Sequence, residues 1–468
     1  MSDTRFTHHM SDEDALMWHI EKDPILRSTI LAVAVFDQPP EWTRLRARIE
    51  RATRVIPRLR QRVVSPPLRL GPPRWTVEPS FDLDFHLRRL RLTPPGDAPT
   101  LLDALQPIAS AAFDRARPLW EFTLFEGLEG DRAALAMKVH HSITDGVGGM
   151  ELLAELVDLE REPAAADADE DVNLPAVPAP NTLGSIALVR DSLTHTSRRA
   201  LGITRRFPGT VASSAFAALR DPAGAALNVT VTARSIGKLL APATAPMSPI
   251  MRERGLGRCL AMLNVGLDDL RRTAKTTGGS LNDVFLAAVI GGLHRYHDRH
   301  GATVASLRMS LPISLRNADD DAGGNRFAPA RFPVPAAVED PSERVQQLGT
   351  LVRSWRAEPA LRMTSALAGV LNRMPTATTT ALFGGMLKCC DFVATNVPGA
   401  PVPVYAGGAR MERMYAFAPT AGAAVNVALI SHCDTCCIGV VVDTTAVPDA
   451  ATLVDCLREG FEELLAIS

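Results

Sequence analysis

The chain has 468 residues, a formal net charge of −2 at pH 7, 46% hydrophobic residues and 22% charged residues. This length exceeds the size at which one hydrophobic core stops growing, so two domains are expected. The nearly balanced charge argues against a nucleic-acid-binding protein. The polar N-terminus is not expected to act as a secretory signal, and no apolar run is long enough to cross a bilayer, so we expect a cytoplasmic protein.

The first 113 residues predict alternating helices and strands. A capping box at residues 11–14 precedes a short helix, a β-branched strand follows at 29–36, and further helices are predicted at 42–56 and 101–113. Strict alternation predicts a half-buried strand at 81–87. Arg58, Arg60 and Arg62 also alternate, which favours an exposed strand face over a surface that steers an anionic substrate.

A hairpin is predicted next, and it carries the most informative residues of the chain. Pro118 precedes a strand at 120–125, where Trp120 can pack beside the second strand at 133–140. That second strand ends in His140 and His141. A helix is expected at 147–156, so the two histidines lie where a strand ends and the chain turns.

Composition then divides the chain. Residues 161–182 read as a mobile acidic, alanine- and proline-rich linker. Residues 183–257 read as a helical connecting segment with pairs of arginines, either a solvated helix pair or a basic amphipathic surface for a membrane. We therefore expect an N-terminal domain over 1–160 and a C-terminal domain over 258–468.

The C-terminal half returns to an αβ pattern. Ser280 is a suitable N-cap for a buried helix at 281–290, whose first turn contains Asn282 and Asp283. These two side chains either face a substrate or only satisfy the helix start. The other predicted elements are strands at 306–316 and 392–399, a hairpin turning at 434–435, and a final helix at 448–467.

The seven cysteines do not form a disulfide framework, because they are odd in number and scattered. The spacing of Cys433 and Cys436 is half a zinc site. No second pair of matching spacing accompanies it, so the cysteines are better explained as small strand residues beside a hairpin turn.

The histidine pair suits general-base chemistry. Acyl transfer to a hydroxyl needs a base that takes the proton as oxygen attacks the carbonyl, and the ordinary pKa of histidine lies near the operating pH. One histidine is sufficient, so the other histidine and Asp145 would fix the geometry. Zinc is the competing interpretation, but adjacent histidines on a strand point to opposite faces.

Glycines follow the histidines, at Gly146, Gly148 and Gly149. They would let the backbone turn tightly and approach a ligand closely. The sequence lacks the GxSxG elbow of serine hydrolases and the glycine-rich fingerprints of nucleotide-binding proteins.

Taken with its surroundings, the motif HHSITDG at 140–146 resembles the HHxxxDG motif of the bacterial wax ester synthase/diacylglycerol acyltransferase family. This family belongs to the chloramphenicol acetyltransferase-like and condensation-domain superfamily. The resemblance extends over most of the chain outside the linker and residues 183–240. Its other segments are 11–15, 81–87, 117–121, 281–284, 396–399 and 447–449.

The resemblance implies an α/β fold with mixed sheets, in which two chloramphenicol acetyltransferase-like domains enclose a substrate tunnel. It implies that His141 is the general base and that Asp145 is structural, with Arg316 as a candidate partner. Asn282 is the candidate for positioning the substrate or the oxyanion, a role that backbone amides near Gly148 could share. Asp283 and Asn396 are further candidates for substrate contact.

The sequence therefore predicts an acyl-CoA-dependent O-acyltransferase that uses no cofactor. The acceptor would be diacylglycerol, a fatty alcohol or both, giving triacylglycerol or wax ester. Two alternatives are kept: the same fold acting on another alcohol or hydrolysing acyl-CoA, and a non-catalytic lipid-surface protein. The inner membrane and lipid droplets are the expected surfaces for peripheral association, and the sequence does not indicate an oligomeric state.

Overall fold

The protein is described here from a computed structural model. It describes residues 8–67, 71–143, 146–162, 245–314, 327–358 and 374–467, with short further stretches at 176–179, 184, 187–192, 194, 197, 368–369 and 371–372. The predicted linker falls almost wholly, and the predicted helical segment mostly, outside the described residues.

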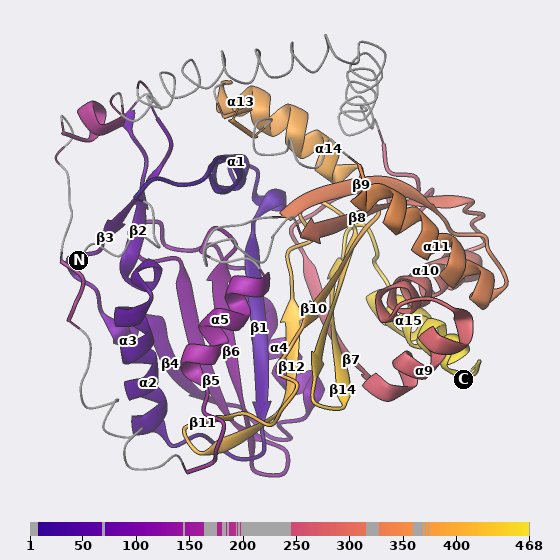
Figure 1. The fold of residues 1–468 in the computed structure, drawn as a ribbon, viewed down its shortest axis with the longest axis horizontal. Helices are drawn as coiled ribbons and strands as arrows, with labels where there is room; N and C mark the ends of the chain where they lie inside the picture. The colour runs from indigo at the N-terminus through magenta and orange to yellow at the C-terminus, as the bar shows by residue number, and fades with distance from the viewer. Residues whose placement is uncertain are drawn as a thin grey trace, which may run out of the picture.

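The first half builds most of one large sheet, a separate two-stranded sheet from residues 61–64 and 74–77, and the helices around them (Figure 1). Its helices are α1 (Asp12–Ile20), η1 (Pro24–Leu26), α2 (Trp42–Val55), η2 (Pro57–Arg60), α3 (Leu83–His86), α4 (Ala98–Ser110) and α5 (Gly146–Leu156). Its strands are β1 (Thr29–Phe36), β2 (Gln61–Val64), β3 (Arg74–Val77), β4 (Leu87–Arg91), β5 (Trp120–Leu128) and β6 (Arg132–His140).

The second half builds the other large sheet and a layer of longer helices (Figure 1). Its helical elements are α9 (Leu267–Thr277), α10 (Leu281–Arg299), α11 (Pro341–Arg356), α13 (Thr376–Thr379), the π-helical turn η5 (Thr380–Gly384), α14 (Gly385–Lys388) and α15 (Ala450–Leu465). Its strands are β7 (Arg258–Gly266), β8 (Ser306–Ser314), β9 (Phe327–Pro335), β10 (Phe392–Pro398), β11 (Tyr405–Ala406), β12 (Ala409–Phe417), β13 (Val425–His432) and β14 (Thr435–Asp443).

The two halves are not separate in space. The first sheet has the order β11-β12-β1-β6-β5-β4, so two strands from the second half complete it. β12 pairs antiparallel with β1 from Leu31↔Phe417 to Phe36↔Met411. The second sheet has the order β7-β14-β13-β10-β8-β9 and uses only second-half strands.

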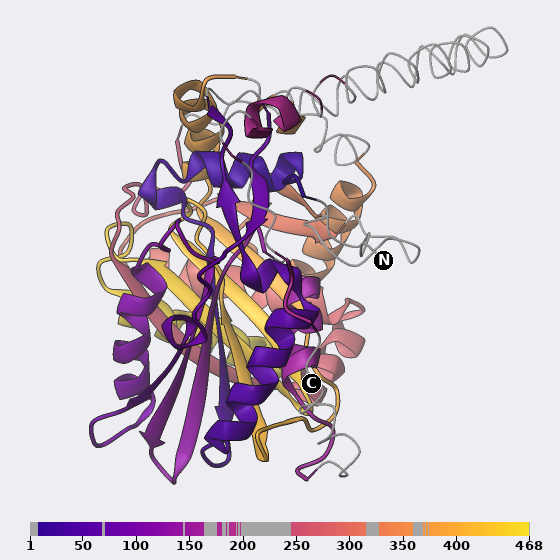
Figure 2. The same ribbon diagram turned by 90° about the vertical axis from the view of Figure 1, so that its left-hand side faces the viewer.

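The sheets also pack against each other. One apolar cluster joins Leu31 and Val33 of β1 to Phe417 of β12 and to Cys437 and Val441 of β14. Figure 2 shows yellow strands of the second half running beside the indigo and purple strands of the first. The resulting mixed α/β arrangement of two sheets confirms the predicted fold class.

Most predicted elements are found close to their expected positions. Ser11 is the N-cap of α1, because its side chain accepts from the amide of Asp14 at 3.0 Å, but the Asp14 carboxylate accepts from the Ser11 hydroxyl at 2.8 Å rather than from the Ser11 amide that a capping box would use. The hairpin β5–β6 is confirmed, with Trp120 opposite Val139. A capping box between Ser280 and Asp283 begins α10, as the N-cap prediction requires.

Two predictions of exposed or half-buried strand were wrong. Arg62 lies half-buried in the strand β2, but Arg58 and Arg60 lie in the 3-10 turn η2, since Pro57 begins it with its fixed φ. Both side chains are buried, because their guanidinium groups lie over the rings of Trp75 at 4.5 Å and Phe81 at 4.4 Å. Burial lowers the pKa of Arg58 to about 10.

The second error concerns residues 81–87, which contain the one-turn helix α3 rather than a strand. Asp82 accepts a hydrogen bond from the amide of Asp84 at 3.0 Å and so begins the helical turn. Phe81 and His86 instead join Trp120 in an aromatic cluster, in which the ring of His86 lies 5.2 Å from that of Phe81 and 4.6 Å from that of Trp120. The strand β4 begins only at Leu87.

Within the part of the chain that the structure describes, no helix is long and apolar enough to cross a membrane.

Candidate active site

The turn at residues 140–143, called the histidine turn below, is fixed by backbone hydrogen bonds to two neighbouring segments. His140 closes β6, where it pairs with Thr29 of β1, and its amide donates to the carbonyl of Leu119 at 3.0 Å. The amide of His141 donates to the carbonyl of Ser28 at 2.8 Å, and that of Ile143 donates back to His140 at 2.9 Å. The chain therefore leaves the sheet in a tight turn at the predicted position.

The imidazole of His140 is buried and both of its nitrogens have partners. The amide of Ser142 donates to Nδ1 at 3.0 Å, and the hydroxyl of Ser142 lies 2.7 Å from the same nitrogen. Nδ1 is thus an acceptor, so the ring proton lies on Nε2. Nε2 donates to Glu21 Oε1 at 2.9 Å. His140 consequently has no ring nitrogen left for a substrate.

Glu21 was not among the sequence candidates, although it lies at the centre of the site. Its Oε1 also accepts from the amide of Ser28 at 2.6 Å, and its Oε2 lies 3.5 Å from Arg115. Burial opposes ionisation of this carboxyl, but His140, the Ser28 amide and Arg115 outweigh it and lower the pKa of Glu21. No sequence pattern links Glu21 to a histidine 119 positions away.

Aromatic and basic side chains surround His140. The ring of Trp18 lies 5.8 Å from it and that of Phe113 lies 6.0 Å from it, both edge-on. The guanidinium of Arg115 covers Trp18 at 4.2 Å. On the other side, the ammonium of Lys138 covers Phe113 at 4.4 Å, and burial lowers the pKa of Lys138. His140 is therefore enclosed by aromatic rings, each of which is covered by a basic group.

A cavity of about 220 Å³ adjoins His140. It is lined by Trp18, Glu21, Arg27, Thr29, Ala112, Phe113, Arg115, Leu119 and His140. A second cavity, of about 50 Å³, shares Arg27 and Thr29 with it and is further lined by second-half residues, among them Arg258 and Phe417. The smaller cavity thus lies at the boundary between the two halves, and Arg27 and Thr29 separate it from the cavity beside His140.

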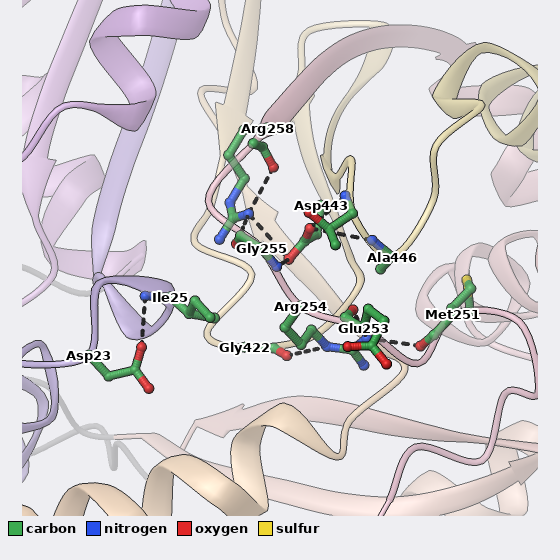
Figure 3. A network of polar contacts seen from close by, with 12 residues as sticks. Asp23, Ile25, Met251, Glu253, Arg254, Gly255, Arg258, Gly422, Asp443 and Ala446 are labelled. Carbon is green, nitrogen blue, oxygen red and sulfur yellow. Dashed lines mark hydrogen bonds and ion pairs between the residues drawn. The ribbon is translucent and has the colours of Figure 1, made fainter.

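A polar network supports the second-half wall of the smaller cavity (Figure 3). Asp443 is fully buried and accepts from the amides of Gly255 at 2.9 Å and Thr445 at 3.0 Å, while Arg258 lies 3.3 Å from it. Arg254 binds the carbonyl of Gly422 at 2.7 Å. Figure 3 shows Ile25 of the first half across from these residues. The segment before β7 is therefore held firmly beside η1.

The structure places His141 directly after β6, half-buried at the turn. Gly146 and Gly148 lie in the first turn of α5. Gly149 follows them, and no heavy atom would lie within 4 Å of a Cβ added there. Asp145 and Arg316 lie outside the described residues, so the predicted pairing between them stays a prediction.

The second-half candidates lie elsewhere in the fold. Asn282 is half-buried at the start of α10. This helix packs against α9, α11 and α15. It lies on the far side of the second sheet from α5 (Figure 1). The carboxylate of Asp283 accepts from the amide of Ser280 at 2.9 Å and from its hydroxyl at 2.7 Å. Asn396 is half-buried in β10, opposite Leu429 of β13. Among the described residues, no hydrogen bond connects Asn282 or Asn396 to the histidine turn.

The cysteines behave as strand and core residues. All seven are free thiols, and Cys433 lies at the turn between β13 and β14. Burial raises the pKa of Cys436 and of Cys390 to about 11, which disfavours the thiolate that a metal requires. In the described ranges, no group of three or more histidine, cysteine or acidic residues is arranged to hold a metal ion.

Two family models match the chain. The wax ester synthase/diacylglycerol acyltransferase catalytic domain matches residues 10–285, and the C-terminal domain of the same family matches residues 323–465. A relative from Mycobacterium tuberculosis (strain H37Rv), named "Putative diacyglycerol O-acyltransferase Rv2484c", is 36% identical over 473 residues, which cover 100% of this chain and 94% of the relative.

Solved structures show the same fold at lower identity. The wax ester synthase/diacylglycerol acyltransferase from Marinobacter aquaeolei VT8 matches with a TM-score of 0.65 and 22% identity, covering 97% of this chain and 98% of that chain. The first condensation domain of the CDA synthetase matches with a TM-score of 0.65 and 17% identity, covering 99% and 97% respectively.

Proposed function

Since the chain belongs to the wax ester synthase/diacylglycerol acyltransferase family and is an O-acyltransferase, we propose that it transfers a long-chain acyl group from acyl-CoA to the hydroxyl of diacylglycerol. The product is triacylglycerol. The observation that carries this proposal is the histidine turn: His140 is fully engaged by Glu21 and Ser142, which leaves His141 as the histidine that acts on the substrate.

The reaction is a direct transfer in which His141 is the general base. It takes the proton of the acceptor hydroxyl as that oxygen bonds to the thioester carbonyl carbon. The tetrahedral intermediate then breaks its carbon–sulfur bond, and the CoA thiolate leaves with the proton that His141 returns. No acyl-enzyme forms, so the protein contributes proton transfer, orientation and charge stabilisation.

The oxyanion of the intermediate needs hydrogen-bond donors, and we assign them to backbone amides of the first turn of α5. A helix start leaves its first amides without partners inside the helix, and Gly146 and Gly148 are the residues of this turn. The space around Gly149 supports a ligand at this position. Asn282 stays a candidate for substrate positioning only if a substrate reaches from the histidine turn to α10.

The acceptor is assigned by similarity to named relatives. The relative that is 36% identical over the whole chain is named for diacylglycerol. A fatty alcohol is the second candidate acceptor, because the related structure from Marinobacter carries both activities in its name. One of the condensation-domain structures of this fold contains C8-CoA, which supports acyl-CoA as the donor.

The test is a competition assay with one long-chain acyl-CoA, diacylglycerol and a fatty alcohol, followed by mass analysis of all products. We expect triacylglycerol as the main product, and little free fatty acid. Wax ester as the main product would reassign the acceptor, whereas free fatty acid alone would make the protein a thioesterase.

In the same assay, His141→Ala should lower kcat by at least about a thousandfold, as the loss of a catalytic base does in comparable enzymes. Its circular dichroism and unfolding temperature should match the wild type. The matched control is His294→Ala, which removes a half-buried histidine of α10 and should leave turnover unchanged. Retained turnover in purified His141→Ala would refute the assignment of the base.

A further inference from the structure

The first-half segment between α1 and β1 contacts both histidines of the motif. Glu21 follows α1 directly, and Ser28 precedes β1. Glu21 accepts from Nε2 of His140, and the Ser28 carbonyl accepts from the amide of His141. The same carboxylate accepts from the Ser28 amide at 2.6 Å, so one side chain joins the two contacts.

From this geometry we infer that Glu21 is a positioning residue for acyl transfer, acting on His141 through His140 and Ser28. The inference rests on the proposed function, since it assigns a role to Glu21 in that reaction. Glu21 is not a catalytic base in this scheme, because its carboxylate is committed to His140, the Ser28 amide and Arg115.

The first part of this role concerns the tautomer of His140. A carboxylate beside Nε2 favours the ring form that carries its proton there, and Ser142 favours the same form from the Nδ1 side. With both nitrogens satisfied, the ring is fixed in one orientation at the end of β6. Because His141 is the next residue, the position of its backbone is restricted by the fixed orientation of His140.

The second part concerns the backbone of His141 itself. Its amide is bound to the carbonyl of Ser28, and the amide of Ser28 is bound to Glu21. A displacement of the Ser28 segment would therefore move the turn from which the His141 side chain projects. Errors of about 1 Å in such positioning can reduce turnover about a hundredfold.

Burial makes the carboxylate costly to replace. The Glu21 side chain is 9% exposed and the His140 side chain is 2% exposed. Removing the carboxylate would leave two buried N–H groups, His140 Nε2–H and the Ser28 amide, without their acceptor. A glutamine could still accept from both through its carbonyl oxygen, but it would place an uncharged amide beside Arg115.

The experiment compares Glu21→Ala and Glu21→Gln with the wild type. We expect Glu21→Ala to lower kcat about 10- to 100-fold, the range found at metal-bound histidines when the side chain that orients them is removed, with KM changed less than about twofold. Glu21→Gln should recover most of the lost kcat. Glu50→Gln, which neutralises a carboxylate paired with Arg54 and Arg60 in the same half, is the matched control and should leave both constants unchanged.

A second readout does not depend on turnover. In histidine-labelled full-length protein, nitrogen NMR should show His140 as the Nε2–H tautomer, assigned by the loss of its signals in His140→Asn. Glu21→Ala should convert it to a mixture of tautomers. The inference would be overturned if Glu21→Ala left the tautomer of His140 unchanged, or if it raised KM and left kcat unchanged. If the wild type transferred no acyl group while the tautomer behaved as expected, the proposed function would fail and the structural role of Glu21 would stand.

Discussion

Adjacent histidines at the end of a strand must have different environments, because neighbouring side chains point to opposite faces of the sheet. Here His140 is buried against Trp18 and Phe113 and is fully hydrogen-bonded. His141 is half-buried at the turn. The two histidines therefore differ in burial, and their division of roles stays a prediction.

His86 makes a pH-dependent contribution to stability. It is 1% exposed, its Nδ1 donates to the carbonyl of Trp120 at 2.6 Å, and burial lowers its pKa to about 4. The unfolded chain, with a histidine pKa of about 6.5, binds the proton more readily. Stability is therefore lost as pH falls from about 6.5 to about 4, by roughly 3 kcal/mol for a shift of this size.

The check is urea unfolding of the wild type and His86→Phe at pH 7 and pH 4. Between pH 7 and pH 4 the wild type should lose about 3 kcal/mol more of its free energy of unfolding than His86→Phe does, because phenylalanine does not titrate. Parallel pH dependences for the wild type and His86→Phe would contradict the prediction.

At the scale of elements, the contact between β14 and β12 requires a glycine. A Cβ added to Gly439 would lie 2.1 Å from the carbonyl oxygen of Ala416 and 2.8 Å from its carbonyl carbon. Both atoms belong to the backbone of a paired strand, so they cannot move independently. The two sheets can approach each other here only because residue 439 has no side chain.

Gly439→Ala should therefore destabilise the protein by about 1–3 kcal/mol, the usual cost of overpacking a tight contact. Denaturant unfolding measures the effect. The matched control is Gly385→Ala in α14, where an added Cβ meets no atom within 4 Å and alanine favours the helix. If Gly439→Ala lowered the free energy of unfolding by less than about 0.5 kcal/mol, the strands would be shown to move apart easily, which would contradict the prediction.

At the scale of the whole molecule, the halves depend on each other unequally. β12 covers the edge of β1 and contributes Met411 and Met414 to the first-half core. The second sheet takes no strand from the first half. Asp23 also forms an ion pair with Lys388 of α14, next to the segment that holds Glu21.

Residues 1–257 expressed alone should be insoluble or bind hydrophobic dyes, because β1 becomes an open edge and part of the core is missing. Co-expression with residues 258–468 should restore a soluble complex. Residues 258–468 alone should keep strand-rich circular dichroism, since their own sheet is complete. A well-folded, monomeric 1–257 fragment would contradict this view of the fold.

Sequence patterns by themselves determined the elements whose signals are local. β1, the β5–β6 hairpin and the N-cap of α10 followed from periodicity, turn residues and capping side chains. The position of the histidine pair at a strand end followed in the same way. The patterns failed at Arg58 and at residues 81–87, where stacking against aromatic rings outweighed local alternation.

Only the tertiary structure decided which distant residues meet. Glu21 reaches His140 because α1 and β1 lie beside the end of β6, and no spacing in the sequence encodes that contact. The entry of β12 into the first sheet likewise depends on long-range strand pairing rather than on local propensity. The position of the histidine turn is thus local in origin, but the contacts that hold it come from segments far away in the chain.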